Sequence, residues 1–442
     1  MSDNIITKAN RRRGIMNIFE KLFANTEIPD LYPVKFSLPC GQIHREQIDG
    51  IIRKELQNGD LASRIKPGMS IAITAGSREI TDIDQIVRTV VDFVKECKGE
   101  PFVFPAMGSH GGATAEGQLE VLAGYGITEE TMGCPIYSSM ETVHISDTAS
   151  GLPVHIDSYA AKADAIIPIG RIKPHTDFHG KYESGLMKMM TIGLGKQYGA
   201  NLCHSLGMSN MPVNIEAYAS EVLRLKNVIF GVGIIEDAFH TTYKLSVIPG
   251  EEIKEKEPAL LQEAKSLVPC IPFQKIDVLV LDEIGKDISG AGMDPNVTGR
   301  SPALGISQPF VERIAVLDLT DKSHNNGSGI GNADVTTRRF YDKFNMDVTY
   351  PNCITSHDMN GMKIPAVMPN DRLAVKMALN TCIQNDSPLG DRMVWMKNTL
   401  HLDKFYVTKA LLPEVEENPL MEQCGDPVHA EFDTKGNVSA IR

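Results

Sequence analysis

The sequence predicts an α/β protein made of two α/β domains with mostly parallel sheets and an active site in the cleft between them. Short apolar segments alternate with segments of helical periodicity, which is typical of parallel strands joined by covering helices. The chain has 442 residues, enough for two or three domains. Its apolar content of 42% is that of an ordinary globular protein and predicts a sizeable core.

The first alternating region begins near residue 34, after a surface arm at residues 1–30 that contains one short amphipathic piece, NIFEKLFA. Residues 70–78 predict a buried strand that ends in a glycine turn. Residues 82–99 predict a helix with Asp82 as N-cap and Gly99 as stop, because apolar residues recur at the helical period. The pattern continues with strands at 101–108, 153–157, 163–171 and 228–237 and a helix at 114–126.

A second alternating region begins near residue 275. The polar helical stretch 251–269 separates it from the first region, so we expect a domain boundary near residue 272. The predicted parts are an N-terminal arm at 1–30, an N-terminal domain at 31–271 and a C-terminal domain at 272–442. In the second region we expect strands at 276–285, 313–321 and 404–412 and helices at 333–344 and 371–382.

Composition and charge exclude several classes of function. The formal net charge of −12 argues against nucleic acid as the main partner, since proteins that bind it carry a basic face. No segment approaches the roughly 18 apolar residues of a membrane span, so no membrane partner is expected. The eight cysteines are scattered singly, which favours the reducing cytoplasm over a disulfide framework. Residues 11–13 are arginines with no apolar segment after them, so they do not form a secretory signal.

Three unusual loops directly follow predicted strands: TAGSRE at 74–79, AMGSHGG at 106–112 and GRIKPHTDFHG at 170–180. In open α/β sheets the ligand crevice lies outside the carboxyl ends of the strands. His110 stands among glycines, where an imidazole suits general acid/base work, although an ordinary surface histidine is the alternative. Ser77 and Arg78 could form an anion site or an ordinary turn.

The segment 171–190, RIKPHTDFHGKYESGLMKMM, concentrates imidazoles and amines. His175 and His179 have the spacing of a metal-binding pair on a helix, which would suit a metal hydrolase. Pro174 and Gly180 disfavour a regular helix here, and the zinc pattern His-Glu-x-x-His is missing. Lys188 lies between apolar residues and could be a desolvated nucleophile or a lysine extending to solvent from a helix face.

The order and spacing of these residues resemble the nickel-dependent lactate racemase family. The shared pattern is Gly-x-His after one strand, Pro-His after a later strand, Ser-Gly-x-x-Lys, and a histidine sixteen residues after that lysine. The resemblance implies a nickel pincer nucleotide attached covalently to Lys188. It implies that His204, otherwise a candidate core histidine, binds the nickel, and that His110 and His175 are the two acid/base residues.

The resemblance also implies that Arg78 binds anionic groups, with Ser77 and Gly108 beside the cofactor. In the family, one histidine removes the substrate hydroxyl proton while hydride passes reversibly to the cofactor. The cofactor and the acid/base residues then belong to domain 31–271, and domain 272–442 closes the substrate cleft. The partners implied are a small-molecule hydroxy acid and, transiently, the proteins that make the cofactor.

The chain departs from the family pattern in ways that argue against lactate itself. About three residues are inserted between His175 and Lys188, and they bring His179 and Lys181 as candidates for substrate contact. In the second domain, Arg300 stands near the place of the family's Tyr-Gln and lysine and is a candidate for binding the substrate anion. The single tryptophan, Trp395, is a candidate for substrate contact by its likeness to a family tryptophan near the site, with a core role as the alternative. We expect a racemase or epimerase of another 2-hydroxy acid. The alternatives are another hydride-shuttling isomerase with this cofactor and a non-catalytic relative that binds nickel or a nucleotide.

Overall fold

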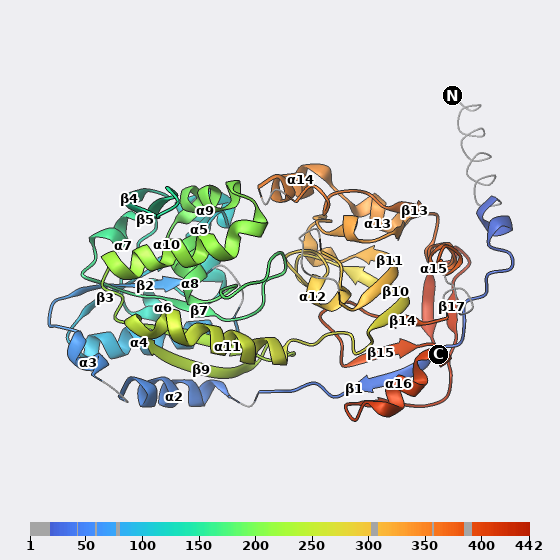
Figure 1. The fold of residues 1–442 in the computed structure, drawn as a ribbon, viewed down its shortest axis with the longest axis horizontal. Coiled ribbons are helices and arrows are strands. Elements are labelled where there is room, and N and C mark those ends of the chain that lie inside the picture. Colours follow the sequence, from blue (N-terminus) through green and yellow to red (C-terminus); the bar gives the residue numbers. More distant parts are fainter. Residues whose placement is uncertain are drawn as a thin grey trace. The chain divides into compact units, whose positions relative to one another are not determined.

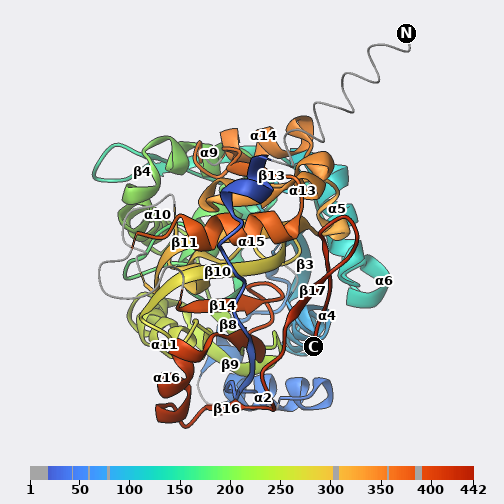
Figure 2. The same cartoon turned by 90° about the vertical axis from the view of Figure 1, so that its right-hand side faces the viewer.

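The computed structural model describes residues 18–41, 43–57, 60–76, 80–301, 308–355, 358–383 and 391–442. The chain forms two compact units, one of residues 39–268 and one that combines residues 1–38 with residues 269–442. Figures 1 and 2 show the two units from two sides. Among the described residues, no helix is long and apolar enough to cross a membrane.

The unit of residues 39–268 contains the first predicted parallel sheet. Its order is β3-β2-β6, and both pairings are parallel, which confirms the α/β prediction. Buried isoleucines and valines of α4 pack against this sheet, as the helical period predicts. Asp82 precedes α4 without capping it, because its carboxylate binds Arg45 instead. The bounds are β2 Ser70–Ala75, β3 Glu100–Pro105, β6 Ala165–Ile167 and α4 Ile83–Glu96.

A second sheet in this unit has the order β7-β8-β9. The sequence predicts one strand at 163–171, but Pro168 divides it into β6 and β7, which belong to different sheets. Proline has no N–H to donate, so it interrupts a ladder. Residues 153–157 form an antiparallel hairpin with β4 instead of joining the parallel pattern. The bounds are β7 Ile169–Arg171, β8 Phe230–Glu236, β9 Thr242–Pro249, β4 Thr142–Asp147 and β5 Pro153–Asp157.

Helices cover these sheets and carry most of the candidate site. A turn of π-type helix at Met189–Gly193 joins α8 to α9. In Figure 1, α10 and α11 run across the same unit as the strands β2 and β7. The helices are α2 Arg45–Gln57, α3 Leu61–Arg64, α5 Ala115–Gly124, α6 Glu129–Met132, α7 Ser158–Lys162, α8 Leu186–Lys188, α9 Lys196–Ser205, α10 Met211–Leu225 and α11 Ile253–Leu267.

The other unit is built on an eight-stranded sheet of order β13-β12-β11-β10-β14-β15-β1-β16. The pairs from β13 to β14 are parallel, and those from β14 to β16 are antiparallel. The predicted helix at 333–344 begins instead as the short strand β12. The strands are β1 Tyr32–Phe36, β10 Lys275–Ile284, β11 Phe310–Leu319, β12 Val335–Thr337, β13 Ala366–Met368, β14 Met393–Met396, β15 Lys404–Val407 and β16 Met421–Gln423.

Short helices and a small hairpin complete this unit. Asn370 caps α15 by accepting a hydrogen bond from the N–H of Leu373 at 3.0 Å. The remaining elements are α12 Pro295–Thr298, α13 Arg338–Lys343, α14 Met346–Thr355, α15 Asp371–Asn380, α16 Leu412–Glu417, β17 Ala430–Phe432 and β18 Val438–Ile441.

The N-terminal residues belong with the C-terminal half of the chain. The sequence pattern assigns residues 31–38 to the N-terminal domain, whereas the structure places β1 between β15 and β16. Within the predicted arm, residues 18–22 are helical and Phe23 is buried against the core of this unit, while residues 1–17 lie outside the described ranges. The chain leaves unit 39–268 at residue 268, four residues before the expected boundary.

Candidate active site

The loops at the carboxyl ends of β2, β3 and β7 meet around the segment that bears Lys188. A methyl group added to Gly76 would lie 3.1 Å from the Cε of Met189, and one added to Gly170 would lie 3.6 Å from the same atom. A methyl group on Gly193 would lie 3.2 Å from the Cβ of Ala106. Met189 directly follows Lys188, so the three loops surround this turn. Ser77 and Arg78 lie outside the described residues.

The loop that carries His110 is held through its carbonyl groups. The buried Gln118 of α5 donates from its amide nitrogen to the carbonyl oxygens of Gly108, at 3.0 Å, and of His110, at 3.3 Å. The Nδ1 of His110 lies 3.3 Å from the carbonyl oxygen of Met107. The His110 side chain is exposed, and Gly108 has a φ of +42°, a conformation that favours glycine. This backbone path presents His110 to solvent at the end of β3.

A fully buried lysine fixes the other end of Gln118. The Nζ of Lys196 donates to the Oε1 of Gln118 at 2.7 Å and to the carbonyl oxygen of Pro105 at 2.8 Å. It lies 3.8 Å from the Oδ2 of Asp157, which is also buried. Burial lowers the pKa of Lys196 to about 8 and raises the pKa of Asp157 above its ordinary value. This network was not predicted from the sequence, because its members lie on separate elements.

Phe178 brings two predicted site residues together. The imidazole of His175 stacks on the Phe178 ring, with centroids 4.1 Å apart and planes inclined by 20°. The Nζ of Lys188 lies 5.8 Å from the centre of the same ring, within the range of a cation–π contact. Phe178 is buried, while His175 and Lys188 are half-buried. The predicted base and the predicted anchor therefore share one aromatic wall.

Glu183 holds the loop between His175 and Gly180. Its side chain is completely buried, and its Oε2 accepts from the backbone N–H of His175 at 2.7 Å and lies 3.0 Å from the Nδ1 of His179. Its Oε1 accepts from the N–H of Gly180 at 3.1 Å and from the Nζ of Lys265 at 2.7 Å. One carboxylate from the predicted insertion thus organises the whole loop.

A second buried carboxylate stands at the start of the Lys188 turn. The Oε2 of Glu257, on α11, accepts from the N–H of Met187 at 3.0 Å. A methyl group on Gly185 would lie 2.5 Å from the Oε1 of Glu257, so only glycine fits here. Among the described residues this Oε1 has no hydrogen-bond partner, and burial raises the pKa of Glu257 to about 7. A buried acid therefore supports the helix turn that carries Lys188.

His204 belongs to the same neighbourhood through α9. A methyl group on Gly108 would lie 3.8 Å from the Cβ of Ala200. His204 follows Ala200 by one helical turn, so the two residues share a face of α9. The helix face that carries His204 is therefore the one that borders the His110 loop.

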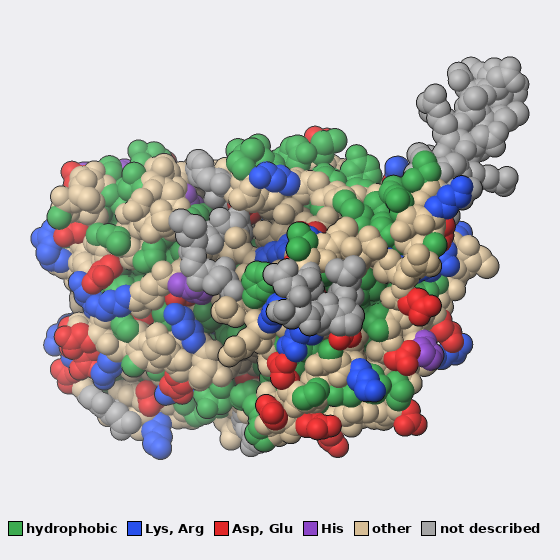
Figure 3. Space-filling view, turned by 45° about the vertical axis from the view of Figure 1, so that its right-hand side comes forward, with side chains coloured by type: hydrophobic (Ala, Val, Ile, Leu, Met, Phe, Trp, Pro, Cys, Tyr) green, Lys and Arg blue, Asp and Glu red, His purple; other side chains and the backbone are tan. Residues whose placement is uncertain are grey.

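Lys181 is exposed to solvent. Its side chain is 55% exposed, and its Nζ lies 3.6 Å from Glu216 on α10. On the face drawn in Figure 3, lysine and arginine side chains are interspersed with acidic ones, in keeping with the acidic composition. The Nζ of Lys181 also lies 5.0 Å from the centre of the Tyr182 ring.

The two candidates from the C-terminal half have structural roles. Trp395 is completely buried, and its indole N–H donates to Asp282 at 2.7 Å, so it cannot reach a ligand at the surface of its unit. Arg300 donates to the carbonyl oxygens of Val311 and Glu312, at the amino end of β11, and pairs with Asp334 at 2.5 Å. It lines a hollow of about 440 Å³ there, at the sheet edge opposite to the one where ligands usually bind.

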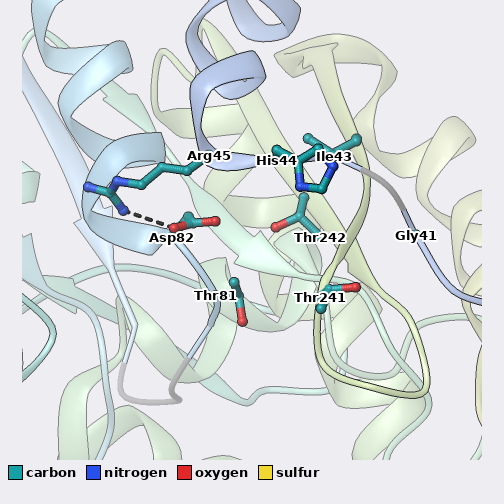
Figure 4. A pocket seen from close by; sticks show the side chains of 8 residues that line it. All are labelled: Gly41, Ile43, His44, Arg45, Thr81, Asp82, Thr241 and Thr242. Atoms are coloured by element: carbon teal, nitrogen blue, oxygen red, sulfur yellow. Dashed lines mark hydrogen bonds and ion pairs between the residues drawn. The ribbon is translucent and has the colours of Figure 1, made fainter.

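A smaller hollow of about 200 Å³ lies elsewhere in unit 39–268 and contains none of the predicted site residues. Figure 4 shows Arg45 directed at Asp82 across one side of it. Arg45 also pairs with Asp84 at 2.5 Å, so its charge is already balanced by two carboxylates. This hollow therefore has no unbalanced charge from Arg45 with which to bind an anion.

The fold and the loops define an α/β domain with histidine side chains in the loops after its strands and Lys188 on the short helix α8. Residues 31–214 match the family described as lactate racemase N-terminal domain. This match supports a function of the racemase type.

One solved structure with similarity to this chain is the lactate racemase apoprotein from Thermoanaerobacterium thermosaccharolyticum. The two have 13% sequence identity and a TM-score of 0.44, and the similarity covers 64% of this chain and 74% of that chain. No curated protein sequence matches the chain.

The residues present fit a cofactor that brings its own metal donors. Within the described ranges, no group of three or more His, Cys, Asp or Glu side chains could hold a metal ion. The Nδ1 of His179 is engaged by Glu183, which disfavours a zinc pair with His175. Three features suit a tethered cofactor that needs one imidazole ligand. They are the half-buried Lys188, the single histidine of α9, and the glycines that leave little side-chain bulk in the neighbouring loops.

Proposed function

We propose that the protein is a cytoplasmic racemase or epimerase of a 2-hydroxy acid other than lactate, with a nickel pincer nucleotide attached to Lys188. The observation that carries this proposal is the common contact of His175 and Lys188 with Phe178, in a segment that matches the lactate racemase N-terminal domain family. Residues 272–442 would close the substrate cleft.

Lys188 would hold the cofactor through its amine, and His204 would supply the one imidazole that a square-planar nickel ion with three cofactor donors still needs. When bound, this cofactor supplies a hydride acceptor for the carbinol carbon of the substrate. Gly108 leaves room at the loop of His110, and Ser77 and Arg78 would bind anionic groups there. The buried carboxylate of Glu257 accepts from the N–H of Met187 and so holds the helical turn that carries Lys188.

The proton transfers fall to His110 and His175. Each enantiomer presents its hydroxyl group on a different side, so one histidine serves each side. The Nδ1 of His175 accepts from the N–H of Asp177 at 3.0 Å, so the neutral ring in this structure carries its proton on Nε2. To take the substrate proton at Nε2, the ring would carry its own proton on Nδ1, which lies 3.7 Å from the Oδ2 of Asp177, and it would return the proton as the imidazolium. The stacked Phe178 keeps the ring of His175 in one orientation.

The test compares the chain made in cells that synthesise the cofactor with its variants. Intact mass should show an adduct on the wild-type chain and none on Lys188→Ala. His110→Ala and His175→Ala should keep the adduct and lose about 10²- to 10⁴-fold in interconversion of enantiomers, the usual contribution of a general acid/base group.

Two results would contradict the proposal. If Lys188 stays unmodified in such cells, the protein does not carry the cofactor on this residue. If either histidine variant keeps full activity, that histidine is not one of the two acid/base residues. A non-catalytic carrier would bind the cofactor without exchanging deuterium at the carbinol carbon of any 2-hydroxy acid.

A further inference from the structure

The two histidines of the 175–180 loop differ in the hydrogen bonds of their rings. The Nδ1 of His175 accepts from the backbone N–H of Asp177 at 3.0 Å. The Nδ1 of His179 lies 3.0 Å from the Oε2 of Glu183. An ionised carboxylate can only accept, so the direction of the second bond depends on the charge of Glu183.

The surroundings of Glu183 fix that charge. Its two oxygens meet the N–H groups of His175 and Gly180, the Nζ of Lys265 and the Nδ1 of His179, and the first three can only donate. Three donors, one of them the ammonium group of Lys265, favour the carboxylate over the acid, whose proton could be directed only at the Nδ1 of His179. The Nδ1 of His179 is then the donor.

We propose that Glu183 is a positioning residue that fixes the tautomer of His179. With its proton held on Nδ1 by Glu183, the His179 ring presents Nε2 as a hydrogen-bond acceptor for a hydroxyl group. The neutral His175 ring has the opposite form, with its proton on Nε2.

A donor imidazole and an acceptor imidazole on one loop suit a ligand group that both donates and accepts. An alcohol hydroxyl is such a group. The inference rests on the proposed function for its substrate class and adds that His179, from the apparent insertion, binds a hydroxyl group of that substrate through Nε2. Its side chain is 32% exposed, so Nε2 lies within reach of a ligand.

The first measurement uses the chain without cofactor. Long-range ¹H–¹⁵N correlation spectra of the histidine rings at neutral pH should show His179 with its proton on Nδ1 and His175 with its proton on Nε2. In Glu183→Gln, His179 should shift toward the other tautomer, and the amide protons of His175 and Gly180 should exchange at least tenfold faster. Lys265→Met is the matched control, because Glu183 keeps three donors and His179 should keep its tautomer.

The second measurement uses the cofactor-loaded chain. Glu183→Gln should lower kcat by about 10- to 100-fold, a part of the usual effect of an acid/base group, with a smaller change in KM and an unchanged mass adduct on Lys188. An adduct that never forms would contradict the proposed function but leave the tautomer result standing. A wild-type His179 with its proton on Nε2 would overturn the inference even if Glu183→Gln failed to fold.

Discussion

The two loops that carry the predicted proton-transfer histidines are held by opposite kinds of hydrogen-bonding group. The His110 loop uses its carbonyl oxygens, which accept from the amide of Gln118, and a buried ammonium group fixes that amide. The His175 loop uses its N–H groups, which donate to the carboxylate of Glu183.

This difference shows that similar glycine-containing loops need not be fixed in the same way. The His110 loop depends on Lys196, which is fully buried with its charge balanced by Asp157 at 3.8 Å. The His175 loop depends on Glu183, whose partner Lys265 is 29% exposed to water. Loss of the first cation should therefore affect the whole unit, and loss of the second should act locally.

The largest expected effect is that of Lys196→Met. Removal of one partner from a buried ion pair leaves the other charge unpaired, and Gln118 also loses its acceptor contact with Nζ. We expect the free energy of unfolding to fall by about 3–5 kcal/mol. Urea unfolding at pH 7 measures this loss. In the control variant Lys265→Met, the free energy of unfolding should fall by no more than about 1 kcal/mol. Equal losses in the two variants would show that the two anchors do not differ.

A smaller effect on stability is expected for the buried Glu257, which holds the turn that carries Lys188. Its pKa is raised from an ordinary 4.5 to about 7, so between these values the folded chain keeps a proton that the unfolded chain releases. Stability from this group is therefore present below pH 4.5 and is lost as the pH rises through 7. Glu257→Gln cannot ionise, so it should gain on the order of 3 kcal/mol relative to wild type across this window.

Urea unfolding of both chains from pH 4.5 to 8 gives this difference directly. A constant difference between wild type and Glu257→Gln would show that Glu257 stays ionised in the folded chain. The amide keeps an acceptor for the N–H of Met187, so the variant preserves the turn that carries Lys188.

The smallest effect extends the comparison to the other unit. Arg300 is held by backbone carbonyls of β11 and by Asp334, and a lysine cannot make these contacts together. Arg300→Lys should lower the free energy of unfolding by about 1–2 kcal/mol and leave the substrate KM of the loaded enzyme unchanged. A KM raised tenfold at unchanged stability would restore Arg300 as a substrate-binding residue.

The sequence predicted what depends on local pattern. The strands β2, β3 and β8 and the helix α4 follow from apolar periodicity, and the strand-end position of the His110 and His175 loops follows from them. Where one residue changes the pairing, the pattern is insufficient. Pro168 divides one apolar run between two sheets. The short strand β12 is followed at once by the helix α13, and the helical pattern of the sequence extends over both elements.

The parts of the site that the sequence did not predict depend on partners far along the chain. Glu183 looks like a surface charge in a polar segment until Lys265 on α11 is placed beside it. Lys196 has the sequence neighbourhood of an exposed lysine, yet its contacts are Pro105 and Gln118. The family resemblance places residues by motif, and a motif contains no information on such long-range partners.

The position of β1 has a consequence for the order in which the chain folds during synthesis. Tyr32 pairs with Val407, and Val34 pairs with Gln423, so β1 leaves the ribosome long before either neighbour exists. Residues 39–268 contain all the strands of their own sheets and can fold while the rest is still being made. Until the last segment emerges, β1 is a strand with two open edges, and it is the part of the nascent chain most exposed to wrong pairing.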